Sequence, residues 1–228
     1  MSTLEHLIET STLPERVGRP ESVIYLVDNT VDGQGASPRE IREALERLRP
    51  SKEIVVERFH NVTLRRVDAL EPSHIILSGQ SHPWNTYTAE SLAGVFDVIR
   101  HARQPILGVC GGHQQIALAY GVAVAVMQRL APGEGYEGCL RERGFFEVET
   151  DGEAIFAGLP RSVTVWHSHY EEVKELPEGF ERTATSQTCA IQAMRHTSRP
   201  LFSVQFHPEL FDEEHPHGRR ILENFLDL

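Results

Sequence analysis

Short apolar runs alternate with helical patterns through the first half of the sequence. The runs are typical of buried strands, and they lie at residues 22–27, 53–59, 74–77 and 105–109. Between them, residues 38–48 and 88–101 place apolar side chains on one stripe, which predicts amphipathic helices, the first with Ser37 as its N-cap. Strands that alternate with helices pack into a parallel sheet with helices on its faces. We therefore predict an α/β fold with a mostly parallel central sheet flanked by helices.

The second half of the sequence is richer in strands than in helices. Five further strand patterns lie at residues 145–149, 163–166, 181–186, 190–194 and 201–206. A final helix is expected at about residues 218–226. We therefore add a small antiparallel extension to the core and assign residues 21–228 to one domain. Residues 1–20 form an N-terminal extension in this interpretation, with one short helix at residues 4–9.

Composition and charge exclude several classes of protein. The 228 residues include 22 basic and 33 acidic ones, a formal net charge of −11 that argues against a nucleic-acid partner. No apolar run approaches the ~20 residues of a membrane helix. The three cysteines (Cys110, Cys139 and Cys189) have no paired spacing, so neither a disulfide framework nor a zinc knuckle is expected. We predict a cytoplasmic protein with no membrane partner.

One cysteine lies where a nucleophile could stand. Cys110 ends a buried strand and precedes an alanine-rich helix, within the pattern Gly108-x-Cys110-x-Gly112. A free cysteine at such a place is more often a small apolar residue, but the flanking glycines are typical of a nucleophile elbow. The helix N-terminus favours a thiolate, and the Gly111 backbone N–H could stabilise an oxyanion.

A base and an orienting carboxylate occur together near the end of the chain. His207 and Glu209 are two residues apart at a strand end, so their side chains share one face. Of the 12 histidines, this is the one followed by a carboxylate in that arrangement. Glu209 could orient one imidazole nitrogen while the other faces the thiol.

Residues 105–121 and 202–210 resemble the class I glutamine amidotransferases. The resemblance implies a flavodoxin-like fold with Cys110 as the nucleophile that forms a γ-glutamyl thioester. It implies His207 as general base and acid, Glu209 as its orienter, and Gln114 as a glutamine-binding residue. No cofactor and no metal are implied.

Further stretches resemble the amidotransferase subunits of GMP synthetases, at residues 165–173, 176–180, 190–196 and 221–225. By this resemblance, Ser168, His169 and Tyr170 close over bound glutamine. The loop with Gly79 and Gln80 would give the second oxyanion donor, although the family usually has glycine where Gln80 stands. Gly111 likewise replaces a larger apolar residue.

The sequence has no phosphate-binding loop for ATP. The ammonia released from glutamine would therefore pass to a separate ATP-dependent synthetase or ligase. Alternatives are an amidotransferase for a ligase outside purine synthesis and a γ-glutamyl hydrolase acting on another γ-glutamyl substrate. A regulatory protein without activity is less compatible with the three reactive residues. Zinc at His167 and His169, or at His215 and His217, is a weaker alternative.

Overall fold

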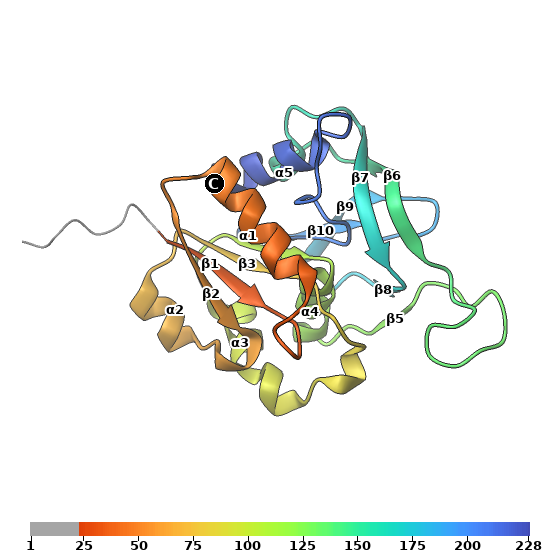
Figure 1. Cartoon of the computed structure of the whole chain (residues 1–228), viewed down its shortest axis with the longest axis horizontal. Coiled ribbons are helices and arrows are strands. Elements are labelled where there is room, and N and C mark those ends of the chain that lie inside the picture. The colour runs from red at the N-terminus through yellow and green to blue at the C-terminus, as the bar shows by residue number, and fades with distance from the viewer. Residues whose placement is uncertain (1–22) are drawn as a thin grey trace, which may run out of the picture.

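The computed structural model describes residues 23–228 of the chain. The predicted N-terminal extension and its helix at residues 4–9 lie outside the described residues. Nine strands of the described part form one mixed sheet in the order β2-β1-β3-β4-β11-β10-β9-β6-β7 (Figure 1). Two shorter strands, β5 (Val124–Val126) and β8 (Glu171–Val173), pair separately.

One half of the large sheet is parallel and the other antiparallel. The parallel strands are β1 (Val23–Asp28), β2 (Glu53–Arg58), β3 (His74–Leu77), β4 (Ile106–Val109) and β11 (Leu201–Val204). The antiparallel strands are β10 (Ala193–His196), β9 (Phe180–Thr185), β6 (Glu142–Thr150) and β7 (Ser162–His169). The predicted α/β class with a parallel core and an antiparallel extension is confirmed, and the extension continues the same sheet.

Helices cover both faces of the parallel half (Figure 1). The helices on one face are α1 (Ala36–Leu48) and α5 (His217–Leu226), and those on the other are α2 (Leu64–Leu70), α3 (Ala89–His101) and α4 (Gly111–Ala119). In β1, Ile24 and Leu26 join the apolar cluster under the first pair, whereas Tyr25 and Val27 join the other cluster. Because both faces are covered, most positions of the inner parallel strands are apolar, which makes these strands visible in the sequence.

The start of α1 differs from the prediction. Its N-cap is Gly35, and Ser37 lies inside the first turn. The Ser37 hydroxyl instead accepts a hydrogen bond from the Gly79 backbone N–H at 2.9 Å. Ser37 as N-cap was therefore wrong, because its hydroxyl serves a contact with the loop after β3 that local sequence does not reveal. The seven residues of α2 and the β5–β8 pair were also missed.

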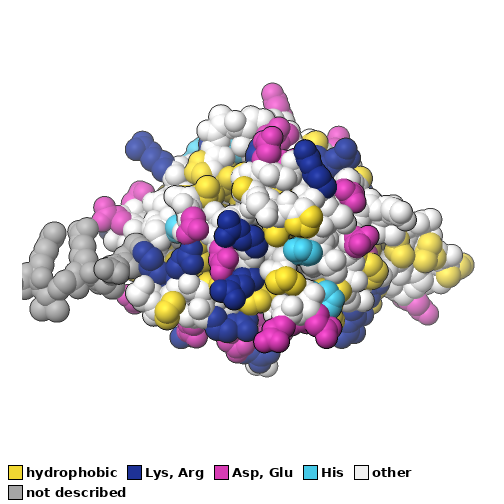
Figure 2. Space-filling view, turned by 90° about the horizontal axis from the view of Figure 1, so that it is seen from above, with side chains coloured by type: hydrophobic (Ala, Val, Ile, Leu, Met, Phe, Trp, Pro, Cys, Tyr) yellow, Lys and Arg dark blue, Asp and Glu magenta, His cyan; other side chains and the backbone are white. Residues whose placement is uncertain are grey.

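The surface carries charges of both signs. On the face shown in Figure 2, basic side chains lie among acidic ones, so the acidic excess is not gathered into one patch there. None of the helices within residues 23–228 combines the length and the apolar character needed to cross a bilayer.

Candidate active site

Cys110 lies on a strained turn between β4 and α4. Its φ of 50° and ψ of −101° are unusual for a residue with a side chain. A Cβ on Gly108 would lie 2.5 Å from the Gly112 carbonyl oxygen, and a Cβ on Gly112 would lie 2.3 Å from the Leu77 carbonyl oxygen. Both positions therefore require glycine. The turn has the geometry of a nucleophile elbow, with the cysteine held clear of the sheet.

The sheet brings His207 and Glu209 to Cys110. Both residues follow β11, which pairs in parallel with β4 so that Val204 lies opposite Val109. The His207 ring interacts with Cys110, with which it lines one cavity, and its Nδ1 lies 2.8 Å from the Glu209 Oε1. The three residues predicted as a triad thus form one continuous set of contacts.

The charges around His207 favour its protonated form. Burial acts to lower its pKa, because the residue is only 7% exposed. The Glu209 carboxylate, followed by Cys110, outweighs burial and raises the pKa of His207 well above 6.5. An imidazolium beside a thiol stabilises the thiolate, which is the nucleophilic form of cysteine.

Gln80 and Gly111 are fitted to each other. A Cβ on Gly111 would lie 2.0 Å from the Gln80 side-chain oxygen and 2.3 Å from the Gln80 backbone nitrogen. Gln80 and Gly111, the two departures from the family pattern, therefore form one feature. The Gln80 side chain occupies the space that a side chain at position 111 would fill. The Gly79 backbone N–H donates to the Ser37 hydroxyl, whereas the Gln80 backbone nitrogen lies next to Gly111.

The amide of Gln114 on α4 is held on all sides. Its Oε1 accepts hydrogen bonds from the Gln80 Nε2 at 3.0 Å and the Trp84 Nε1 at 2.8 Å. Its Nε2 donates to the Glu171 carbonyl oxygen at 3.0 Å and to the Gln205 Oε1 at 3.1 Å. Gln114 therefore braces the walls of the site. Trp84 and Gln205 were not predicted from the sequence, and direct contact of Gln114 with glutamine stays a prediction.

A cavity of about 190 Å³ opens beside Cys110. Gln80 and Gln114 line it, and residues 168–171 form one wall, so the predicted Ser168, His169 and Tyr170 all border it. Glu171, which was not predicted, has a buried Oε2 with no hydrogen-bond partner among the described residues. Burial raises the pKa of this carboxyl. Its place next to the predicted segment was the only signal in the sequence that could have found it.

Tyr136 covers the same cavity from the segment between β5 and β6. Its ring stacks on Tyr170, with centroids 4.7 Å apart and planes 8° from parallel. Burial, followed by the nearby Glu171 carboxyl, raises the pKa of Tyr136, and the Arg141 guanidinium lies 4.8 Å from the centre of the Tyr170 ring. Tyr136 was not predicted either, because the segment that carries it has no regular pattern.

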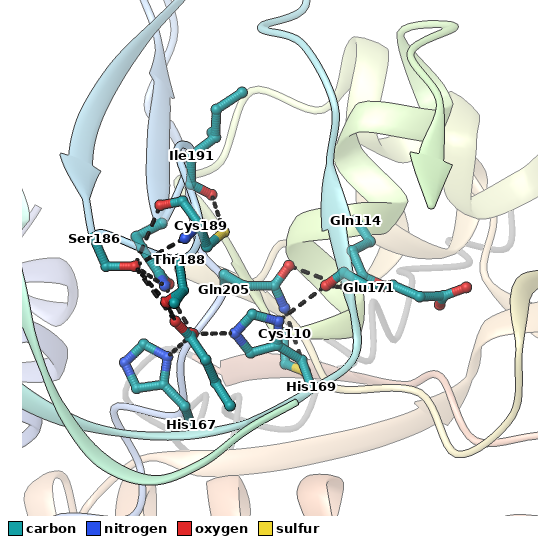
Figure 3. A network of polar contacts seen from close by, with 12 residues as sticks. Cys110, Gln114, His167, His169, Glu171, Ser186, Thr188, Cys189, Ile191 and Gln205 are labelled. Carbon is teal, nitrogen blue, oxygen red and sulfur yellow. Dashed lines mark hydrogen bonds and ion pairs between the residues drawn. The ribbon is translucent and has the colours of Figure 1, made fainter. Parts of the chain in front are cut away.

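A second polar network lies behind the cavity wall (Figure 3). The Oε2 of Glu142 lies 2.7 Å from the His167 Nδ1, 2.6 Å from the His169 Nε2 and 2.9 Å from the Gln192 Nε2. Of the described residues, Glu142, His167 and His169 are grouped tightly enough for a metal, with ligand atoms within 4.8 Å of one another. Both imidazoles, however, point these nitrogens at the carboxylate at hydrogen-bond distance. Nitrogens that carry protons offer no lone pair to a metal, so the group has the character of a hydrogen-bond network.

The other histidine pair considered for zinc is used differently. The His215 Nδ1 lies 3.0 Å from the Asp212 Oδ1, and the His217 Nδ1 accepts a hydrogen bond from the Thr164 backbone N–H at 2.9 Å. Each of the two rings is therefore held by a different neighbour, Asp212 for His215 and Thr164 for His217.

Comparison with known proteins identifies the family. A family model described as "Glutamine amidotransferase class-I" matches residues 36–228. The chain belongs to the class I glutamine amidotransferase family. The predicted enzyme class, a glutamine-hydrolysing amidotransferase, is thereby confirmed.

Relatives of this amidotransferase include subunits of a larger enzyme. It is 42% identical over 166 residues to a glutamine-hydrolyzing GMP synthase subunit of Pyrococcus abyssi, a match that covers 72% of this chain and 80% of the relative. The identity to the subunit of the same name from Methanocaldococcus jannaschii is 36% over 196 residues, or 86% and 93% of the two chains.

Solved structures show the same fold. A Thermoplasma acidophilum protein, provisionally described as a GMP synthase subunit, gives a TM-score of 0.73 at 31% identity over 90% of this chain and 93% of that one. A glutamine amidotransferase from Thermotoga maritima gives a TM-score of 0.67 at 19% identity, over 91% and 99% of the two chains.

Proposed function

We propose that this amidotransferase is the glutamine-hydrolysing subunit of a two-subunit GMP synthase, with Cys110, His207 and Glu209 as its catalytic residues. The observation that carries the proposal is the continuous set of contacts from Glu209 through His207 to Cys110 at the edge of an amino-acid-sized cavity. The identities of 36–42% to glutamine-hydrolyzing subunits of GMP synthases support the pathway.

The reaction begins with attack of the Cys110 thiolate on the side-chain carbonyl carbon of glutamine. The backbone N–H groups of Gln80 and Gly111 stabilise the oxyanion that forms. Protonated His207 gives its proton to the leaving nitrogen, so ammonia departs and a γ-glutamyl thioester remains. Neutral His207 then takes a proton from water, the hydroxide attacks the thioester, and glutamate and the thiolate are released. Glu209 holds the imidazole in position through both steps.

The cavity favours free glutamine over a larger γ-glutamyl compound. Its volume of about 190 Å³ lies below the range of about 300–1,000 Å³ of sites for drug-sized ligands. Glu171 is the acidic residue among those that line the cavity, and a carboxyl group there suits the α-ammonium group of an amino acid. A γ-glutamyl hydrolase acting on a peptide-like substrate would need more room at this wall, where Tyr136 stacks on Tyr170.

The ammonia would pass to a separate ATP-dependent synthetase subunit. A second cavity of about 380 Å³ also borders Cys110 and His207, and its lining includes Arg143 and Trp166. We assign this cavity to the departure of ammonia, because it reaches the reacting sulfur without crossing the glutamine cavity wall at residues 169–171.

Glutamate release from glutamine tests the proposal, measured for the chain alone and with a GMP synthase ATP-pyrophosphatase subunit, xanthosine monophosphate and ATP. We expect stimulation by the partner and formation of GMP, both absent with Cys110→Ala. Glutaminase activity that is unchanged by this partner would support the Cys110 chemistry but reject the assignment to GMP synthesis. Hydrolysis of γ-glutamyl peptides in preference to glutamine would reject both.

A further inference from the structure

His169 is held between two groups that can only accept hydrogen bonds. Its Nδ1 lies 3.0 Å from the Glu171 carbonyl oxygen, and its Nε2 lies 2.6 Å from the Glu142 Oε2 (Figure 3). A neutral imidazole carries one N–H and could satisfy one of these acceptors. Either His169 carries a proton on both nitrogens, or Glu142 is a neutral carboxylic acid.

The surroundings of Glu142 decide between these two states. Its Oε2 also accepts from the His167 Nδ1 and the Gln192 Nε2, and its Oε1 accepts from the Thr188 hydroxyl. Burial opposes ionisation, but the hydrogen bonds from His167 and His169 outweigh it and hold the pKa of Glu142 far below its usual range. A carboxyl group surrounded by this many donors acts as an ionised acceptor, so the geometry leaves both ring nitrogens of His169 as donors.

Few other charged groups lie near the pair formed by Glu142 and His169. Glu142 on β6 and His169 on β7 are register partners and are 3% and 4% exposed. His167 on β7 is a neutral neighbour, because burial lowers its pKa. On α4, burial and then the charge of His169 lower the pKa of His113 to about 3. Cys189 is another neutral neighbour, because burial raises the pKa of its thiol, and Glu171 on β8 meets His169 through its backbone carbonyl.

The carbonyl that His169 fixes is the one that joins the network to the substrate cavity. The Glu171 carbonyl oxygen accepts from His169 and also from the Gln114 Nε2 at 3.0 Å. Glu171 also lines the cavity beside Cys110. A displacement of this backbone would therefore move both Glu171 and Gln114.

We propose that Glu142 keeps His169 as an imidazolium, and that this buried ion pair is the positioning device that sets the Glu171 backbone for glutamine binding. The proposal rests on the assignment of the cavity to glutamine. It makes Glu142 and His169 positioning residues, which act through Glu171 and Gln114 and leave the Cys110–His207 chemistry unchanged.

The protonation state is tested without activity, by ¹⁵N spectroscopy of histidine-labelled protein at about pH 7. We expect two protonated ring nitrogens for His169, with its signals identified by their loss in His169→Asn. Glu142→Gln should leave one protonated nitrogen, and Glu147→Gln on the exposed side of the same strand should change nothing. A single protonated nitrogen for His169 in the unmodified chain would overturn the proposal, whether or not the variants fold. Stoichiometric zinc in the purified chain, lost in Glu142→Gln, would also overturn it.

Kinetics test the positioning role separately. Glu142→Gln should raise the KM for glutamine about tenfold or more, as expected for loss of a charge-assisted hydrogen bond, with a smaller change in kcat. Glu142→Asp, which keeps the charge, should recover part of that loss, and alkylation of Cys110 by iodoacetamide should keep its rate. An unchanged KM in Glu142→Gln would reject the positioning role while the unmodified enzyme still hydrolyses glutamine. Absence of glutamine hydrolysis in the unmodified enzyme with its partner would instead reject the proposed function.

Discussion

The parallel and antiparallel halves of the sheet contribute to the site in different ways. The parallel half places Cys110 and His207 directly after two neighbouring strands, β4 and β11. The antiparallel half supplies residues 168 and 169 of the cavity wall, which continues into β8, and the Glu142 network behind it. The first arrangement depends on short contiguous motifs, whereas the second depends on side chains that meet across strands. We infer that reactivity belongs to the parallel half and substrate affinity to the antiparallel half.

The largest expected effect is at the nucleophile. Cys110→Ala should lower kcat for glutamine hydrolysis by about 10⁴-fold or more, because no other group can form the thioester. The fold should persist, since the residue that replaces cysteine is small. Glutamate release and circular dichroism check both points. Substantial glutaminase activity in this variant would contradict the assignment of the nucleophile to the parallel half.

The next largest effects separate the base from its orienter. His207→Ala should abolish turnover, and Glu209→Ala should cost about 10²-fold less, because Glu209 orients the ring without transferring the proton. Both losses should fall on kcat, in contrast to the KM effect expected for Glu142. The two variants are compared in one kcat assay, and equal losses would mean that the triad is wrongly drawn.

Gly111→Ala should lower kcat by about 10²-fold, the usual cost of disturbing one oxyanion donor. The added methyl group would lie 2.0 Å from the Gln80 side-chain oxygen and 2.3 Å from its backbone nitrogen. Combination with Gln80→Gly should restore part of the activity, because the first of these clashes disappears. Strictly additive effects in the double-mutant cycle would contradict the inference that Gln80 and Gly111 are fitted to each other.

The smallest expected effect is the pH dependence of stability at Glu142. Its pKa lies below the ordinary value of 4.5, so the ionised group contributes stability above about pH 4.5 and loses that contribution as the pH falls further. Urea unfolding of the unmodified chain and Glu142→Gln should differ most above about pH 5, and the difference should shrink towards pH 3. A difference independent of pH would show that Glu142 is not ionised in the folded protein.

The same contrast explains what could be predicted from the sequence. The strands at residues 74–77 and 105–109 are mostly apolar, and the glycines around Cys110 are required by backbone contacts, so local patterns revealed both. Glu142 and His169 meet across 27 residues of chain, and neither has a distinctive neighbour in sequence. Ser37 was misassigned because a tertiary partner, the Gly79 N–H, took its hydroxyl. The Glu142 network behind the cavity wall, and Glu171 and Tyr136 in the lining, therefore needed the structure.

Reaction with the glutamine analogue 6-diazo-5-oxonorleucine, followed by peptide mass mapping, tests the central assignment most directly. The chain has three cysteines, and Cys110 is the one that borders the cavity and contacts His207. We predict a single adduct, on Cys110, that excess glutamine suppresses and His207→Ala slows. Modification of Cys139 or Cys189 in place of Cys110 would contradict the account.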